Sequence, residues 1–270
     1  MRYGLAAWGL RETPLEEQLA LAKDLGVDLL ELSIANHPND PLQLESGNED
    51  IARVIAAFEK YGIALECGCT GNDFTCGDTA SGIANLKKVI AIAGKLKLKT
   101  LRIFAGFTSD SLVYGNVFSD MLDALAEVNA AASDVGVTLC VETHGGVTAL
   151  DNGALLHFNS VSTRSDCWKE ILKTGVSMTF DPANLTAVGI NAPEAFYLQF
   201  KEAVHYVHLK DFKDVPGGIV PAACGEGRIN WKTLLEAMKD CDLPAMIEYE
   251  IPADVKVGMK RSLDFLRKNA

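Results

Sequence analysis

One pattern recurs along the chain and restricts its fold more than any other: a helical stretch ends in glycine, and a short apolar segment follows at once. The clearest copies are LGVDLLEL (25–32), YGIALECG (61–68), VGVTLCVE (135–142) and TGVSMTFD (174–181). Glycine ends helices because it adopts left-handed backbone angles without strain. An almost continuous run of apolar residues is typical of a parallel strand covered on both faces. The pattern therefore predicts alternating helices and parallel strands.

Further segments complete this alternation. Strand-like runs occur at YGLAAWG (3–9), LKTLRIFAG (98–106), VHYVHLKD (204–211) and PAMIEYE (244–250). Apolar residues at helical spacing predict helices at 13–25, 81–96, 118–135, 231–241 and about 254–268. Eight strands in 270 residues correspond to about 30 residues per unit, as in a (β/α)8 barrel.

We therefore predict an α/β fold with a single TIM-barrel domain over residues 1–270 and an active site at the C-terminal ends of the strands. A doubly wound open sheet is the alternative. It is disfavoured because no G-x-G-x-x-G follows the first strand and no Walker loop is present.

The composition narrows the possible partners. A net charge of −11 disfavours general nucleic-acid binding, which usually needs a basic face, but it suits a metal site built from carboxylates. No apolar run approaches the roughly 20 residues of a membrane span, and no clear signal-peptide pattern is present. The seven cysteines include no C-x-x-C pair and are expected to be free thiols. We expect a cytoplasmic protein that binds neither nucleic acid nor membranes.

Ionisable residues stand where four successive strands are predicted to end. They are Glu142 in VETHGG, Asp181 in FDPAN, His208 in VHLKD and Glu248 in IEYE. The carboxyl ends of barrel strands meet at one rim, so these side chains should lie together. Three carboxylates there would repel one another unless a cation neutralised them. The set predicts one divalent metal ion: Mn²⁺, Mg²⁺, Co²⁺ or Zn²⁺.

In this order, VETHGG, FDPANL, VHLKD, GEGRINW and IEYE resemble the xylose isomerase-like barrel superfamily of sugar phosphate isomerases and epimerases. The resemblance covers essentially the whole chain. It implies that Glu142, Asp181, His208 and Glu248 hold the metal, with Glu250 as the alternative on the last strand. It also implies that Glu142 and Glu248 are catalytic and exchange a proton α to a carbonyl from opposite faces of the substrate.

The resemblance leaves the substrate open. Ketose 3-epimerases carry a histidine where this chain has Asn184, and a glycine–glutamate pair where it has Lys210 and Asp211. We expect a metal-dependent isomerase or epimerase of a small carbohydrate or sugar phosphate. The sequence leaves open whether the chain forms a homo-oligomer. A dehydratase of inosose or dehydroshikimate type is the alternative. An apurinic endonuclease is disfavoured by the low number of histidines, and a non-catalytic sugar-binding barrel by the four intact ligands.

Five residues are expected to bind substrate: Trp8, His144, Asn184, Lys210 and Arg228. Trp8 would line a sugar pocket or simply pack in the core. His144 would contact a hydroxyl or shuttle a proton, unless it is a loop histidine bonded to backbone. Lys210 would bind a substrate oxygen or pair with a carboxylate. Arg228 would meet an anionic group or lie at the surface, in the segment CGEGRINW, whose glycines could bring backbone N–H groups close to a ligand.

Other ionisable residues lie near the predicted rim. Glu31, at the end of the second strand, is a candidate pocket residue. Arg102, inside the fourth strand, is expected to neutralise a barrel acid such as Glu66 or Glu142. His157 is expected to be structural.

Overall fold

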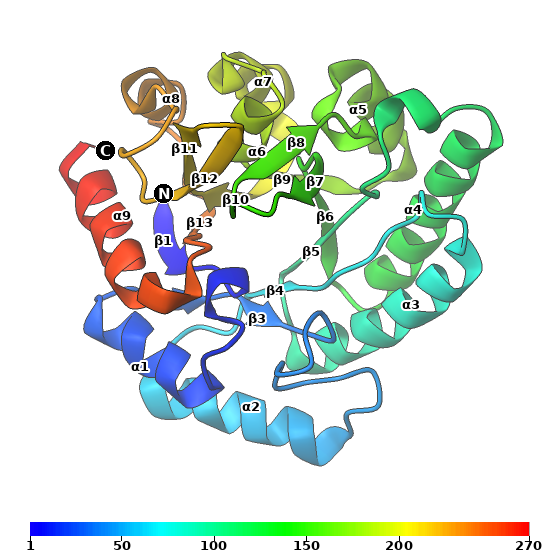
Figure 1. The fold of residues 1–270 in the computed structure, drawn as a ribbon. Helices are drawn as coiled ribbons and strands as arrows, with labels where there is room; N and C mark the ends of the chain where they lie inside the picture. The colour runs from blue at the N-terminus through cyan, green and yellow to red at the C-terminus, as the bar shows by residue number, and fades with distance from the viewer. Residues whose placement is uncertain (270) are drawn as a thin grey trace.

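The structure is a computed structural model that describes residues 1–269. Within these residues, nine parallel strands form one sheet in the order β2-β1-β13-β10-β9-β6-β5-β4-β3 (Figure 1). The strands are β1 (Arg2–Leu5), β2 (Leu29–Leu30), β3 (Leu32–Ser33), β4 (Cys67–Cys69), β5 (Thr100–Ile103), β6 (Thr138–Glu142), β9 (Ser177–Phe180), β10 (Val204–Leu209) and β13 (Pro244–Ile247).

The sheet closes into a barrel because its two outermost strands, β2 and β3, are halves of one predicted strand. Glu31 alone separates them. β2 pairs with β1, and β3 pairs with β4, so the two halves connect the two ends of the sheet. The eight expected strands are present, with the second one broken at Glu31. The predicted (β/α)8 TIM barrel is therefore confirmed.

Helices surround this barrel (Figure 1). They are α1 (Leu15–Asp24), α2 (Asn48–Tyr61), α3 (Thr79–Leu96), α4 (Asn116–Asp134), α5 (Ser165–Ile171), α6 (Pro182–Ala187), α7 (Pro193–Phe200), α8 (Trp231–Ala237) and α9 (Val255–Asn269). The helices predicted from apolar spacing correspond to α1, α3, α4, α8 and α9, with ends shifted by a few residues.

The helix-ending glycines adopt the backbone conformation on which the prediction rested. Their φ angles are 65° at Gly26, 68° at Gly62, 74° at Gly136 and 88° at Gly175. These angles lie in the left-handed region, where a side chain would be strained. The glycines stop the helices and turn the chain into β2, β4, β6 and β9.

Four strands end two or more residues earlier than the sequence predicted. The segments expected at 3–9, 98–106, 204–211 and 244–250 stop at Leu5, Ile103, Leu209 and Ile247. Most residues beyond these ends remain buried, so they look like strand residues in the sequence. After β1 the chain forms the short 3-10 helix η1 (Trp8–Leu10), and Trp8 therefore lies beyond the strand rather than at its end.

A second sheet, which the sequence did not predict, has four antiparallel strands in the order β11-β12-β8-β7. They are β7 (Gly146–Ala149), β8 (Leu155–Phe158), β11 (Asp211–Val215) and β12 (Gly218–Ala222). β7 and β8 follow β6, whereas β11 and β12 follow β10, so two loops at the carboxyl ends of barrel strands build this sheet. Figure 1 shows it to one side of the barrel mouth.

Side chains inside the barrel form an apolar layer with a charged layer above it. The apolar layer is a cluster of Ala6, Leu29, Cys67, Cys140, Tyr206 and Met246. Two positions after four of these residues stand Glu31, Glu142, His208 and Glu248. Residues two apart along a strand face the same side of the sheet. The alternation of each strand therefore carries its ionisable residue into the barrel, toward the carboxyl ends.

Two predictions from composition can be compared with the structure. Within residues 1–269, no helix is both long enough and apolar enough to cross a membrane. All seven cysteines are free, as expected.

Candidate metal and catalytic site

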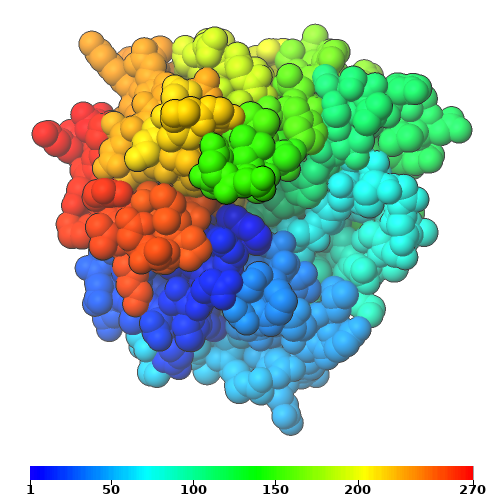
Figure 2. Space-filling view, viewed as in Figure 1, coloured from blue at the N-terminus to red at the C-terminus, as the bar shows by residue number. Residues whose placement is uncertain are grey.

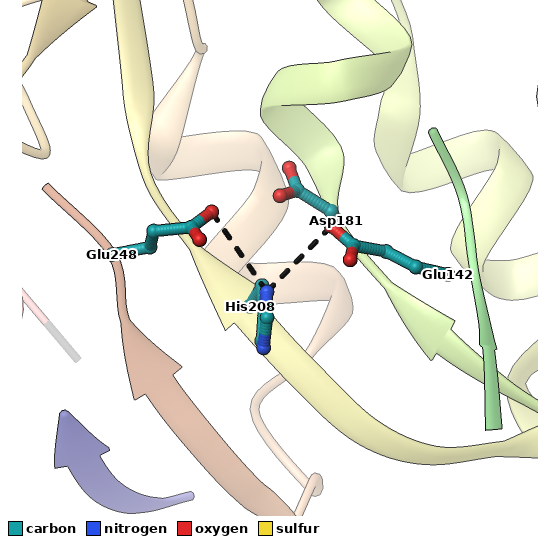
Figure 3. A group of neighbouring side chains, drawn as sticks. All are labelled: Glu142, Asp181, His208 and Glu248. Carbon is teal, nitrogen blue, oxygen red and sulfur yellow. Dashed lines mark ion pairs between the residues drawn. The ribbon is translucent and has the colours of Figure 1, made fainter. Parts of the chain in front are cut away.

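Four side chains converge at the carboxyl ends of four neighbouring strands, β6, β9, β10 and β13 (Figure 3). They are Glu142, Asp181, His208 and Glu248. One potential ligand atom from each lies within 4.8 Å of the others, and all four side chains are buried. The structure thus brings together the four residues that the sequence suggested as metal ligands.

The orientation of Asp181 comes from the helix that follows it. Its Oδ1 accepts hydrogen bonds from the backbone N–H groups of Ala183 at 2.8 Å and Asn184 at 3.0 Å, which makes Asp181 the N-cap of α6. Pro182 at the first helical position favours this start. The helix therefore fixes one carboxylate oxygen and leaves the other, Oδ2, buried without a hydrogen-bond partner.

The two ring nitrogens of His208 have different surroundings. Nε2 lies 3.0 Å from Glu31 Oε1, whereas Nδ1 faces Glu142 and Glu248 and has no hydrogen-bond partner. Burial alone would lower the pKa of His208, but Glu31 and Glu142 raise it well above its usual value. A metal ion at Nδ1 would have to displace a proton.

Glu31 is itself held from several sides. Its Oε2 accepts a hydrogen bond from the backbone of Ala7 at 2.9 Å, and its Oε1 accepts one from the hydroxyl of Tyr206 at 2.9 Å. Burial opposes its charge, but His208 and Arg102 outweigh burial and lower the pKa of Glu31 to about 2. Glu31 is fully buried and does not line the cavity described below, so it supports His208 from behind rather than serving as a pocket residue.

Glu142 is held by an amide and a guanidinium. Asn184 Nδ2 donates to its Oε1 at 3.0 Å, and Arg102 Nε lies 3.2 Å from its Oε2. Burial disfavours the charge, but His208 and Arg102 lower the pKa of Glu142 well below its usual value. Arg102 thus neutralises Glu142, whereas Glu66 pairs with other residues.

Lys210 lies among the acids. Its Nζ is 2.7 Å from Glu248 Oε2, 2.7 Å from Glu250 Oε1 and 3.4 Å from Asp181 Oδ2. Burial would lower the pKa of Lys210, but the carboxylates of Asp181, Glu248 and Glu250 raise it well above its usual value. The ammonium therefore stays charged, and the ion-pair alternative for Lys210 is the one observed.

The donor set fits a divalent cation. Asp181 Oδ2, His208 Nδ1 and Glu248 Oε2 are buried and lack hydrogen-bond partners, and the approach of Lys210 to Glu248 does not have hydrogen-bond geometry. Burial raises the pKa of Asp181 to about 7, with Lys210 opposing the shift and Glu142 adding to it. A bound cation would stabilise the charged carboxylates. These residues could hold a divalent metal ion.

A cavity of about 640 Å³ lies over this group. Its volume is within the roughly 300–1,000 Å³ of small-molecule sites. The polar part of its wall includes Arg102, Glu142, Asn184, Lys210, Glu248 and Glu250. The apolar part includes Phe104, Phe107, Val147, Leu155, Pro221 and Ile251.

The second sheet and the segment after β1 contribute to the wall of this cavity. Val147 and Leu155 come from the β7–β8 hairpin, Pro221 from β12 and Trp8 from η1. In Figure 2 the green surface of the hairpin and the blue surface of the segment after β1 meet at the barrel mouth. The mouth is therefore narrowed by elements outside the barrel sheet.

Trp8 and His144 both line the cavity, and the His144 ring is also bonded to backbone, as its alternative assignment predicted. The His144 ring stands edge-on against Phe104 and Phe107, with centroids 5.3 Å away in each case, and its Nδ1 lies 2.5 Å from the Gly145 carbonyl oxygen. Burial lowers the pKa of His144 to about 4. It therefore presents a neutral imidazole to the cavity at neutral pH.

Asn184 and Lys210 also line the cavity, although protein carboxylates engage their polar groups. Arg228 does not line it. Its guanidinium lies 3.6 Å from Asp214 Oδ1 in β11. The geometry therefore gives no support to the prediction that Arg228 contacts substrate.

The segment CGEGRINW is organised by a protein carboxylate, so the expectation that its glycines approach a ligand was wrong. Asp211 accepts hydrogen bonds from the backbone N–H groups of Phe212, Gly225, Gly227, Arg228 and Ile229 and from Trp231 Nε1, at 2.8–3.3 Å. A Cβ at Gly227 would come within 2.2 Å of Asp211 Oδ1. The glycine is needed there because the carboxylate approaches the backbone closely.

Two ionisable cavity residues were not identified from the sequence. His157, expected to be structural, lines the cavity from β8, and Arg11 lines it from the segment after η1. Neither stands at the end of a barrel strand, so the strand-end argument could not find them.

Residues 19–269 match the family of xylose isomerase-like TIM barrels. The chain belongs to this family, as the resemblance of its motifs predicted.

Solved structures share the fold over almost the entire chain. They include a probable 3-DHS dehydratase, AsbF, from Bacillus anthracis (15% identity, 99% of both chains covered, TM-score 0.79). D-psicose 3-epimerase from Clostridium cellulolyticum H10 has 16% identity, coverage of 100% of this chain and 99% of that chain, and a TM-score of 0.71. The IolI protein with a bound zinc atom has 17% identity, coverage of 100% and 96%, and a TM-score of 0.74. Comparison with curated protein sequences gives no significant match.

Proposed function

We propose that this protein is a divalent-metal-dependent isomerase or epimerase of a small sugar, polyol or sugar phosphate. The observation that carries the proposal is the relation of Glu142 and Glu248 to His208. Each directs a carboxylate oxygen toward its Nδ1, at 3.6 Å from Glu142 and 3.8 Å from Glu248, and the two side chains approach from the right and the left in the view of Figure 3. Two carboxylates facing each other across a substrate carbon could remove a proton from one face and return one to the other.

In this proposal, Glu142, Asp181, His208 and Glu248 would hold one Mn²⁺, Mg²⁺, Co²⁺ or Zn²⁺ ion. When bound, such an ion polarises a carbonyl and stabilises the negative charge left by proton removal. The unpaired, buried oxygen and nitrogen atoms of this group support the assignment.

Neighbouring residues would keep the acid–base pair in position. Asn184 fixes Oε1 of Glu142, which leaves that carboxylate directed toward His208. Lys210 lies 2.7 Å from Glu248 and balances its charge while it is ionised. Trp8 and His144 would contact the substrate from the cavity wall.

A dehydratase using the same site is the second candidate. Loss of a β-hydroxyl after proton removal needs a hydrogen-bond donor near the leaving group. Lys210 supports this candidate because its ammonium lines the cavity beside Glu248. The first proton transfer would be common to both reactions.

Proton NMR in D₂O tests the proposal. The Mn²⁺-loaded protein would be incubated with ketoses, their phosphates and inososes. Deuterium incorporation next to the carbonyl is the expected result; a new stereoisomer would identify an epimerase, a moved carbonyl an isomerase, and an enone a dehydratase.

The matched variants are Glu248→Gln and Glu66→Gln. We expect Glu248→Gln to slow the exchange by about 10²–10⁴-fold, because it removes one acid–base group. Glu66→Gln should exchange normally, because Glu66 pairs with Arg2 and Lys99 away from the cavity. Absence of exchange with every compound, with metal confirmed as bound, would contradict the proposal.

A further inference from the structure

Arg11 brings a positive charge into the cavity without an acidic partner. Its guanidinium lies over the ring of Trp8, 4.5 Å from the centroid, and its Nη1 donates to the carbonyl oxygen of Trp8 at 2.8 Å. In the part of the chain that the structure describes, Arg11 forms no ion pair with a carboxylate.

The other cations of the cavity are already neutralised. Arg102 lies 3.2 Å from Glu142, and Lys210 lies 2.7 Å from both Glu248 and Glu250. Arg11 therefore differs from them, because its charge remains available to a ligand.

The contacts of Arg11 with Trp8 also preorganise its guanidinium for binding a ligand. A guanidinium has five N–H donors, and the bond to Trp8 uses one of them. The stack on the indole restricts the plane of the group, so less conformational entropy is lost when a ligand binds. The remaining donors match the oxygens of a phosphate or carboxylate group.

The negative charge of the whole molecule means that an anionic ligand needs a local cation in the cavity. The net charge of −11 repels anions at a distance, and the floor of the cavity is rich in carboxylates. The cavity volume of about 640 Å³ also leaves room for a group beyond a single sugar ring.

We propose that Arg11 binds an anionic group of the substrate, a phosphate or a carboxylate, remote from the reacting carbon. The identity of the bound molecule as a substrate rests on the proposed function. The binding of an anion at Arg11 does not, and it can be measured without catalysis.

Tryptophan fluorescence provides that measurement, because Trp8 lines the cavity and stacks on Arg11. Trp168 and Trp231 are buried and do not line the cavity. Metal-free protein would be titrated with inorganic phosphate, so that the anion cannot bind through a metal ion. We expect a saturable signal in the wild type, and an affinity at least about tenfold lower in Arg11→Met, because the charge-assisted hydrogen bonds are lost.

Arg11→Lys and Arg228→Met complete the series. Arg11→Lys keeps the charge but loses the planar fork, so its affinity should lie between those of wild type and Arg11→Met. Arg228→Met removes an arginine outside the cavity and should bind phosphate as the wild type does. Unsaturable binding in the wild type, or equal affinity in Arg11→Met, would overturn the proposal.

Deuterium exchange then distinguishes a phosphate from a carboxylate group. It also tests the anion site separately from the proposed function. The Mn²⁺-loaded protein would be compared on D-fructose, D-fructose 6-phosphate and a keto sugar acid. Arg11→Met should raise KM at least about tenfold for whichever anionic compound is used, and by a clearly smaller factor for the neutral sugar. Arg11-dependent phosphate binding without exchange would support the anion site and contradict the proposed function. Exchange of the anionic compound that does not change in Arg11→Met would support the proposed function and contradict the anion site.

Discussion

At the scale of single residues, Glu31 determines which nitrogen of His208 is available to a ligand. Its carboxylate accepts from Nε2 at 3.0 Å, so Nδ1 is left facing the other acids. Tyr206 and the backbone of Ala7 hold Glu31 in place. A carboxylate behind a ligating histidine fixes the ring and increases its basicity toward a metal.

Glu31→Gln should therefore weaken Mn²⁺ binding by about 10–100-fold, as loss of such a supporting carboxylate does elsewhere. Isothermal titration calorimetry of metal-free protein would measure the dissociation constant. Glu66→Gln is the control, since it makes the same change at an acid outside the site and should leave Mn²⁺ affinity intact. Wild-type affinity in Glu31→Gln would show that His208 does not depend on Glu31.

At the scale of elements, the loops after β6 and β10 shape the cavity as much as the barrel strands do. Each forms a hairpin, and Ile219 of β12 pairs with Leu155 of β8 to join the hairpins into one sheet. Asp211, the first residue of β11, also gathers the backbone of the segment that leads to α8. The buried carboxylate of Asp211 thus anchors the connection between β12 and α8.

Asp211→Asn should lower the free energy of unfolding by about 2–4 kcal/mol, because an amide cannot accept all of these hydrogen bonds and places an N–H₂ group against backbone donors. Urea denaturation would measure the change. Asp214→Asn, at an exposed position nearby, should change it by no more than about 0.5 kcal/mol. Equal stabilities of the two variants would refute the anchoring role of Asp211.

At the scale of the whole molecule, barrel closure collects acidic residues that are far apart in the chain. Glu31, Glu142, Asp181 and Glu248 come from different parts of the sequence and share one buried region. Their mutual repulsion is a cost of the metal-free fold, even with Arg102 and Lys210 among them. A divalent cation bound only by the folded protein would stabilise the entire domain.

Mn²⁺ at about 100 times its dissociation constant should therefore stabilise the protein by about 2.7 kcal/mol. For a domain of this size that corresponds to a rise in Tm of roughly 5–10 °C. Differential scanning calorimetry with Mn²⁺ and with EDTA would measure it. Asp181→Asn should abolish most of the rise while retaining the cap of α6, because asparagine is also a good N-cap. An unchanged Tm in the wild type would contradict metal binding at this site.

The sequence predicted the barrel well and the cavity only in part. Gly26, Gly62, Gly136 and Gly175 marked where helices end, because their backbone angles are a local property. The exact ends of four strands, the second sheet and the orientation of CGEGRINW were missed. Apolar composition reports burial, but it does not identify the residue at which strand pairing stops.

The sequence alone determined the alternation of helices and strands and the four candidate ligands, because chain periodicity and the residues at strand ends are local patterns. Only the tertiary structure decided that Glu31 lies behind His208, that Lys210 is paired, and that Arg11 rather than Arg228 faces the cavity. These relations join residues distant in the chain. They depend on how the barrel closes and how its loops fold over the mouth, and neither is encoded in the spacing of any one segment.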